Sequence, residues 1–216
     1  MSEQDFDRLR RAMVSNQLRP SLVTNVAVLS AMDAVPRERF VGEGQGMLAY
    51  RDTIVPLGGG RALNPPIATG RLLDAADPLP GERVLVIGAA TGYVPALLAA
   101  MQCVVTAVDE AALVARARTA LGDTPAITLV EGELTAGAPD RAPYDVVYID
   151  GAVEQVPLAI VEQLVEDGRL VTAIVERGVS RLAIGRRAGA SVGLRAFADV
   201  DTAPLPGFAP APAFSF

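Results

Sequence analysis

The residues best placed to do chemistry surround one glycine turn and the acid that follows it. An apolar run ends at Gly88, a helical pattern begins at Tyr93, and a second apolar run ends on Asp109. In such a unit the glycines let the backbone approach a ligand, and an acid about 20 residues later accepts hydrogen bonds from the ribose hydroxyls. The spacing therefore predicts a site for an adenosine-bearing cofactor with a free 2′-OH.

The turn itself separates two kinds of adenosine cofactor. Nicotinamide sites read G-x-G-x-x-G, whereas residues 88–92 read Gly-Ala-Ala-Thr-Gly. The spacing agrees better with the G-x-G-x-G pattern that is common in S-adenosylmethionine sites, although Ala90 stands where its middle glycine would be. We therefore expect Gly88, Ala89 and Gly92 to bind S-adenosyl-L-methionine.

Further acids follow the later predicted strands. Glu133 could accept a hydrogen bond from the adenine amino group, or it could be an ordinary solvated acid. Asp150 could bind the cofactor ammonium group, repel an acidic substrate, or cap a helix. The predicted cofactor-binding residues are Gly88, Ala89, Gly92, Asp109, Glu110, Glu133, Leu134 and Asp150.

Missing residue types narrow the chemistry further. The chain has 216 residues and contains no His, Trp or Lys, so all 19 basic residues are Arg. This excludes Ser-His-Asp and Cys-His catalysis, Schiff-base lysines, the Walker lysine and His-based metal sites. We expect no metal. Any reaction must depend on positioning and on a borrowed cofactor.

Composition also limits the class of protein and its partners. A formal net charge of −6 disfavours nucleic acid and anionic membranes. Half of the chain is hydrophobic, but no apolar run reaches the roughly 20 residues of a membrane span, and the charged N-terminus does not resemble a signal sequence. The single cysteine, Cys103, falls on a predicted buried strand and fits a reducing cytoplasm. We expect a cytoplasmic monomer or homodimer.

Hydrophobic periodicity predicts the elements that position these residues. Helices are expected at 2–18, 24–35, 64–76, 93–101, 110–121 and 155–165. Strands are expected at 53–57, 83–87, 103–108, 126–130, 144–149 and 169–175, followed by two alternating stretches at 180–186 and 191–200. Strands that alternate with helices imply a parallel sheet covered on both faces, with the last two stretches forming an antiparallel edge.

The predicted organisation is one compact unit in two parts. Residues 1–78 form an N-terminal helical extension with a glycine-rich, substrate-side loop, and residues 79–216 form the α/β core. Ser2 and Asn64 are each placed to cap a helix, and Gly168 is placed to end one. The tail is rich in proline and phenylalanine, and we expect its phenylalanines to dock onto the core: Phe208, Phe214 and Phe216.

Several motifs together resemble the protein-L-isoaspartate O-methyltransferase family. They cover roughly residues 10–175, and the ending of the chain is similar to a bacterial branch of that family. The motifs are Met13-Val-Ser-Asn-Gln-Leu18, Val28-Leu-Ser-Ala-Met32, Val35-Pro-Arg-Glu-Arg-Phe-Val41, Leu48-Ala-Tyr50, Val84 to Tyr93, Ala142-Pro-Tyr-Asp145, Gln163-Leu and Gly168-Arg-Leu-Val171.

The resemblance implies a Rossmann-like class I S-adenosylmethionine-dependent methyltransferase with a helical extension over its active site. It also implies methyl transfer to the carboxylate of isoaspartyl residues in damaged proteins, which is a step of protein repair. A carboxylate of pKa ~3.9 is already ionised at neutral pH, so no general base is needed. A chain without histidine can therefore carry out this reaction.

The chain departs from the family pattern at the expected catalytic position. Asn64 stands in Ala62-Leu-Asn-Pro-Pro66, where the family has a serine thought to bind the substrate carboxylate. Its amide could donate to that carboxylate, or its sole role could be to cap a helix. Val86 replaces an acid in the first strand motif, and Leu134 replaces a glycine after the adenine-binding acid.

Three hypotheses remain open from the sequence. The chain is an active isoaspartyl methyltransferase with altered contacts, a methyltransferase for another carboxylate or hydroxyl, or a catalytically weak paralogue that binds a partner or senses the cofactor. Arg51 and Arg61 flank the loop before Asn64, and either could bind a carboxylate substrate bidentately.

Overall fold

The computed structural model describes residues 3–209. Its centre is a sheet that has eight strands in the described part of the chain, in the order β10-β8-β7-β6-β3-β4-β5, with β9 paired to β8. The strands are β3 (Arg83–Ile87), β4 (Val104–Asp109), β5 (Ile127–Glu131), β6 (Tyr144–Val153), β7 (Leu164–Glu176), β8 (Val179–Ala188), β9 (Ser191–Val192) and β10 (Arg195–Asp199).

The pairing directions confirm the predicted α/β sheet. β7, β6, β3, β4 and β5 run parallel, whereas β8 is antiparallel to both β7 and β10. The inner strands are almost entirely apolar because both faces of a parallel sheet are buried. This arrangement brings the carboxyl ends of β3, β4 and β6 to one edge, where loops from separate parts of the sequence meet.

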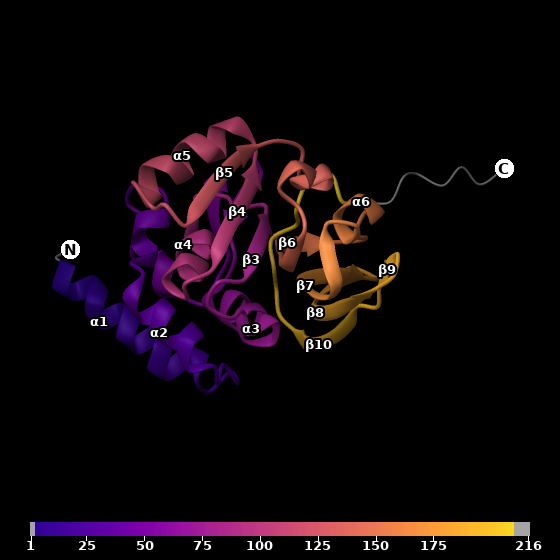
Figure 1. Cartoon of the computed structure of the whole chain (residues 1–216). Coiled ribbons are helices and arrows are strands. Elements are labelled where there is room, and N and C mark those ends of the chain that lie inside the picture. Colours follow the sequence, from indigo (N-terminus) through magenta and orange to yellow (C-terminus); the bar gives the residue numbers. More distant parts are fainter. Residues whose placement is uncertain (1–2, 210–216) are drawn as a thin grey trace.

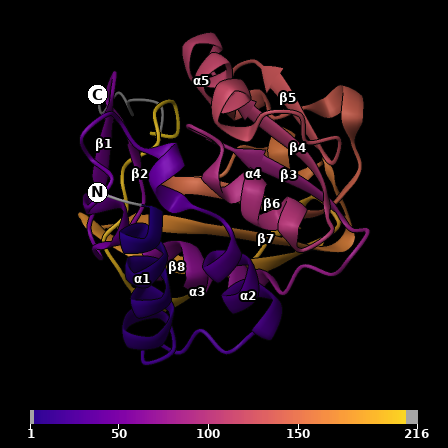
Figure 2. The ribbon, with the colours of Figure 1, turned by 90° about the vertical axis from the view of Figure 1, so that its left-hand side faces the viewer.

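Five α-helices between residues 3 and 121 lie on one face of the sheet. They are α1 (Glu3–Met13), α2 (Val26–Ala34), α3 (Pro66–Ala76), α4 (Tyr93–Ala100) and α5 (Ala111–Leu121). The α3 helix contacts β7 and β8, and α4 and α5 contact β4 and β5. Figures 1 and 2 show α1 and α2 gathered on one side of the molecule.

The opposite face has a thinner cover. Leu85 and Ile87 alternate with Val84 and Val86 along β3, and they belong to the apolar cluster of this second face. Short helices cover it: η4 (Leu134–Ala136), η5 (Pro139–Arg141) and α6 (Leu158–Val161). The C-terminal residues complete the cover, because Phe208 is buried in the same cluster. The predicted docking of Phe208 is confirmed, whereas Phe214 and Phe216 lie outside the described residues.

Small elements connect the extension to the sheet. The π-helix η1 (Val14–Leu18) continues α1, and the 3-10 helices η2 (Arg37–Phe40) and η3 (Leu48–Tyr50) follow α2. β1 (Val55–Gly58) and β2 (Arg61–Leu63) then form a separate antiparallel hairpin. Within residues 3–209, no helix combines the length and the apolarity needed to cross a membrane.

The predicted helix at 155–165 is wrong. Helix α6 has only four residues, and β7 begins at Leu164, which pairs with Tyr144 of β6. Gly168 therefore lies inside a strand and ends no helix. Gln163 follows this short helix, and its side-chain amide donates to the carbonyls of Ala136 and Ala159.

The observed helix caps contradict the prediction at Asn64. Helix α2 is capped by Asn25, whose side chain accepts from the amide of Ala27 at 2.8 Å. Asn64 does not cap α3, since the carboxylate of Asp52 accepts from the amide of Ile67 at 3.1 Å. Ser2, the predicted cap of the first helix, lies outside the described residues.

Candidate active site

The glycine turn after β3 lies next to the end of β4. Gly88 and Gly92 have φ values of +80° and +97°, which favour glycine, and Ala90 is held at +49°. The amide of Ala90 donates to Oδ2 of Asp109 at 2.6 Å, which stabilises this left-handed conformation. The predicted neighbours Gly88 and Asp109 are therefore brought together, with Ala89 buried between the two glycines.

Asp109 forms a buried ion pair with Arg61 of the same chain. The guanidinium of Arg61 binds it bidentately, at 2.5 Å to Oδ1 and 2.9 Å to Oδ2. The amide of Glu110 also donates to Oδ1, at 2.8 Å. Asp109 is fully buried, and the side chain of Arg61 is only 4% exposed. Arg61 was expected to bind a substrate carboxylate, but in this structure it binds the carboxylate of Asp109 instead.

Asn64 and Asp150 form the next part of the site. Nδ2 of Asn64 donates to Oδ1 of Asp150 at 2.8 Å, and Oδ1 of Asn64 accepts from the amide of Ala203 at 2.8 Å. Asp150 lies within β6, so the alternative that it caps a helix is wrong. Burial raises the pKa of Asp150 to about 6, even though the hydrogen bond from Asn64 and the charges of Arg37 and Arg61 favour its ionised form.

A C-terminal segment, residues 202–208, lies across this edge of the sheet, and we call it the closing segment. Its backbone pairs with Ala152 of β6, through Ala152 N to Ala203 O at 2.7 Å and Leu205 N to Ala152 O at 2.9 Å. The side chain of Leu205 lies directly over the glycine turn, because a Cβ added to Gly88 would be 2.7 Å from its Cδ1.

The remaining predicted residues surround an open cavity. Glu110, Glu133 and Leu134 line a space of about 330 Å³, together with Pro206 and Gly207 of the closing segment. Both glutamates are exposed, in contrast to Asp109. We name this cavity and the filled region around Gly88 and Asp109 after the groups that the sequence predicts there: together they are called the crevice, with an adenine end at the cavity and a ribose end at Gly88 and Asp109.

Arg37 is a site residue that the sequence reasoning missed. It is fully buried, donates to the carbonyl of Ala49 at 2.6 Å and to the carbonyl of Asn64, and lies over the ring of Tyr93 at 4.6 Å from its centroid. These bonds fix the backbone that carries Asn64. The sequence feature that could have identified Arg37 is its position in the family motif Val35–Val41.

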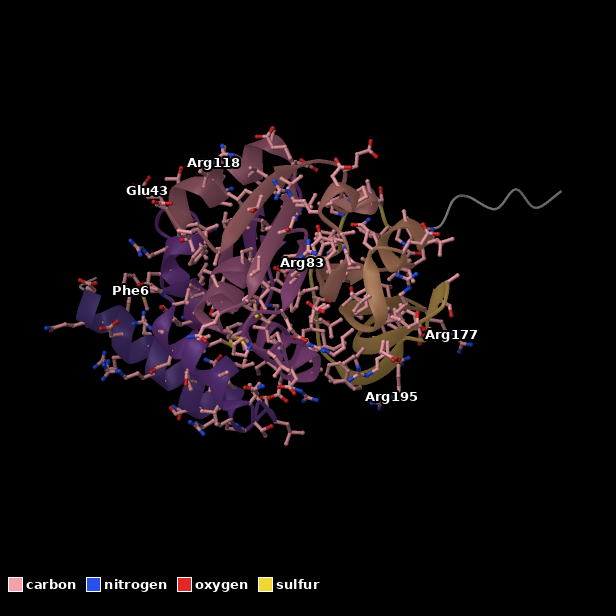
Figure 3. The ribbon with its side chains drawn as sticks, viewed as in Figure 1. Phe6, Glu43, Arg83, Arg118, Arg177 and Arg195 are labelled. Carbon is pink, nitrogen blue, oxygen red and sulfur yellow. The ribbon has the colours of Figure 1, made fainter. Side chains whose placement is uncertain are left out.

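Other candidate residues lie apart from the crevice. Arg51 is exposed, as are Arg118, Arg177 and Arg195, which Figure 3 labels. Cys103 is buried, and burial raises the pKa of its thiol to about 11, so it is no ready nucleophile. Chemistry is therefore concentrated at the edge where β3, β4 and β6 end.

Comparison with solved structures identifies the fold. The chain superimposes on a protein-L-isoaspartate O-methyltransferase with a TM-score of 0.75 and 21% identity, covering 96% of this chain and 66% of the other. A putative protein-L-isoaspartate O-methyltransferase from Plasmodium falciparum, solved in complex with S-adenosyl-L-homocysteine, gives a TM-score of 0.76 at 17% identity, covering 91% and 97% of the two chains. The fold is that of a Rossmann-like class I methyltransferase.

Sequence comparison identifies the family. A protein-L-isoaspartate O-methyltransferase of Roseiflexus sp. (strain RS-1) is 36% identical over 94% of both chains. One of Methylorubrum extorquens (strain PA1) is 37% identical over 93% of this chain and 90% of its own length. The family model for protein-L-isoaspartate (D-aspartate) O-methyltransferase matches residues 8–206. The chain therefore belongs to the protein-L-isoaspartate O-methyltransferase family.

Proposed function

We propose that this chain transfers a methyl group from S-adenosyl-L-methionine to the carboxylate of isoaspartyl residues in damaged proteins. The observation that carries this proposal is the family match over residues 8–206. Asp109 at the end of β4, beside the Gly88 turn, supports it, because an acid there is suited to bind ribose hydroxyls.

The chemistry suits the residues that the chain has. S-adenosylmethionine supplies an electrophilic methyl group when it is bound. The acceptor carboxylate, with a pKa of about 3.9, is already a nucleophile at neutral pH. The protein has only to align the reactants, exclude water and hold the carboxylate without neutralising it. We assign cofactor binding to Gly88, Ala89, Gly92, Asp109, Glu110, Glu133, Leu134 and Asp150.

The acceptor would approach from the other side of Asn64. A cavity of about 610 Å³ extends to Pro65, the neighbour of Asn64, and it is also lined by Asp52, Thr53 and Arg71. A peptide bound there would lie one residue from Asn64, whose amide would have to leave Asp150 to reach the acceptor carboxylate. We therefore propose Asn64 as the residue that orients the acceptor, with residues 1–78 as the substrate-side part of the protein.

The residue types fit a bound nucleoside, but their arrangement in this structure does not. Both oxygens of Asp109 accept hydrogen bonds from Arg61, and Leu205 covers the ligand-facing side of Gly88. The amide of Asn64 is likewise engaged, with Asp150. These contacts favour a second candidate function, a paralogue that binds the cofactor or a partner without turnover.

A peptide assay tests the proposed function. The protein is incubated with labelled S-adenosylmethionine and either an isoaspartyl peptide or the same peptide with a normal aspartyl residue. We expect label in the isoaspartyl peptide alone. Label in neither peptide, together with measurable cofactor binding, would support the paralogue. Label in another carboxylate or hydroxyl compound would identify a different methyl acceptor.

We also propose, as the sequence predicts, that the protein is cytoplasmic, binds neither nucleic acid nor membranes, and is a monomer or homodimer. A sedimentation experiment on the full chain distinguishes the last two states.

A further inference from the structure

We propose that Arg61 and Leu205 close the ribose end of the crevice, so that S-adenosylmethionine binds only after both side chains withdraw. This inference rests on the proposed function, since it concerns the same cofactor site. It makes Arg61 and Leu205 determinants of cofactor affinity, although neither belongs to the predicted binding residues. Four features of the structure support it.

The first feature is competition for the same two oxygens. A ribose bound at Asp109 would need the carboxylate that Arg61 now binds at 2.5 and 2.9 Å. Bidentate arginine–carboxylate pairs are among the strongest hydrogen-bonded pairs in proteins, whereas ribose hydroxyls are neutral donors. The nucleoside must therefore displace a stronger partner, and the displaced guanidinium must find solvent or another acceptor.

The second feature is the filling of the space above the glycine turn. The position of a Cβ on Gly88 would lie 2.7 Å from Cδ1 of Leu205 and 3.3 Å from Nη2 of Arg61. Gly151 faces the same segment, since a Cβ there would lie 2.9 Å from Cβ of Leu205. The bare backbone that a glycine turn offers to a ligand is thus covered by the protein's own side chains.

The third feature is that the hairpin carrying Arg61 has a way to move. Arg61 directly follows Gly58, Gly59 and Gly60, which all have positive φ and have nothing within 4 Å of the position of a Cβ. Such a hairpin tip can change its backbone conformation at low steric cost. Beyond this tip, the hairpin is tied to α5 by one bond, from Nη1 of Arg116 to the carbonyl of Leu57 at 2.7 Å.

The fourth feature is an open entrance beside the closed part. The adenine end already has a cavity of about 330 Å³, and its wall includes Pro206 and Gly207 of the closing segment. An adenine ring can therefore contact the site next to Glu133 while Leu205 is still in place. Binding would then be completed when the closing segment and Arg61 are displaced. If only a fraction of the molecules has the open crevice, the observed affinity is lower than that of the open form by this fraction.

Calorimetric titration of the full chain with S-adenosylhomocysteine tests the proposal. Arg61→Ala removes the competing guanidinium, and its matched control is Arg118→Ala, which removes an exposed arginine. Leu205→Ala uncovers Gly88 and leaves the ion pair intact, so it keeps the test valid if Arg61→Ala fails to fold. Its control is Leu194→Ala, which packs against the same apolar cluster.

We expect Arg61→Ala and Leu205→Ala each to tighten binding by about tenfold or more, and both controls to bind as the wild type does. Hydrogen exchange at the amides of Ala152 and Leu205 should also accelerate when S-adenosylhomocysteine is added to the wild type, because the bonds that these amides donate, to the carbonyls of Ala203 and Ala152 respectively, are lost. Equal or weaker binding by both variants, with unchanged exchange, would overturn the closure.

The same variants separate this inference from the proposed function. Tighter binding without methyl transfer to an isoaspartyl peptide supports the closure and rejects the reaction. Methyl transfer by the wild type, with equal binding in all variants, supports the reaction and rejects the closure. The failure of every folded variant to bind S-adenosylhomocysteine rejects both.

Discussion

The two ends of the crevice differ in what binds their carboxylates. At the ribose end, Asp109 is fully buried and accepts from Arg61, Ala90 and Glu110. At the adenine end, Glu133 is exposed beside an open cavity. A sequence motif determines the chemistry of an acid, but the surrounding fold decides whether that acid is free for a ligand. Asp109 therefore contributes to the stability of the fold, whereas the carboxylate of Glu133 is left open to solvent.

Among the variants that test this contrast, Asp109→Ala should change the free energy of unfolding most. The substitution leaves the guanidinium of Arg61 buried without its carboxylate, so we expect a loss of about 3–5 kcal/mol in the free energy of unfolding. Urea denaturation of both proteins measures it. The double variant Arg61→Met with Asp109→Leu serves as control and should recover most of the loss. A loss below about 1 kcal/mol in the single variant would show that the ion pair is not structurally important.

The next test is Asp150→Asn, which removes a buried charge from the ribose end. Because the folded-state pKa is about 6 and the unfolded value is near 3.9, ionisation of Asp150 costs stability above pH 6 and nothing below pH 4. We expect the variant to be more stable by up to about 3 kcal/mol at pH 8. Denaturation midpoints at several pH values should show this advantage shrinking as the pH falls from 6 to 4. A pH-independent difference would contradict the assignment.

A smaller effect is expected from Leu205→Ala. The side chain is 6% exposed and packs over Gly88, so its truncation should cost about 2 kcal/mol, near the low end for leucine because the segment can relax. Thermal unfolding of the variant and of Leu158→Ala, an exposed leucine of α6, gives the comparison. Equal melting temperatures for the two variants would mean that the closing segment adds no stability.

The smallest change in stability should come from the adenine end. Glu133→Ala alters an exposed side chain, so the free energy of unfolding should change by no more than about 0.5 kcal/mol. The same variant should bind S-adenosylhomocysteine more weakly, by about 1.5 kcal/mol or more, if the carboxylate accepts from the adenine amino group. Wild-type affinity in this variant would remove Glu133 from the cofactor site.

The sequence predicted the order of elements better than their ends. The alternation of apolar runs and helical patterns placed β3, β4 and their helices within a residue or two, because these elements are regular and buried. The prediction failed at the segment directly after β6, whereas the later strands β7, β8 and β10 were predicted. The apolar pattern of residues 155–165 suits a helix, but pairing of Leu164 with β6 begins a strand there instead. Such long-range pairing leaves no local signal.

The partners of the site residues were harder to predict than the residues themselves. Gly88, Asp109 and Asn64 were recognised from spacing and motifs, yet the partner of Asp109 is 48 positions away in sequence and the amide that Asn64 accepts from is 139 positions away. Hydrogen bonds over such separations depend on how the hairpin and the closing segment pack. Sequence reasoning expected that Arg61 could bind a substrate carboxylate, whereas the carboxylate that it binds in this structure is Asp109.

The burial of Phe208 gives the molecule an optical consequence. Phe208 anchors the closing segment in the apolar cluster and is 1% exposed, and the chain contains no tryptophan. A tryptophan placed at this position would be the sole indole in the protein, and its fluorescence would come from a dry environment. Displacement of the closing segment into water would shift that emission to the red. The fluorescence of a tryptophan at position 208 would therefore measure the release of the segment.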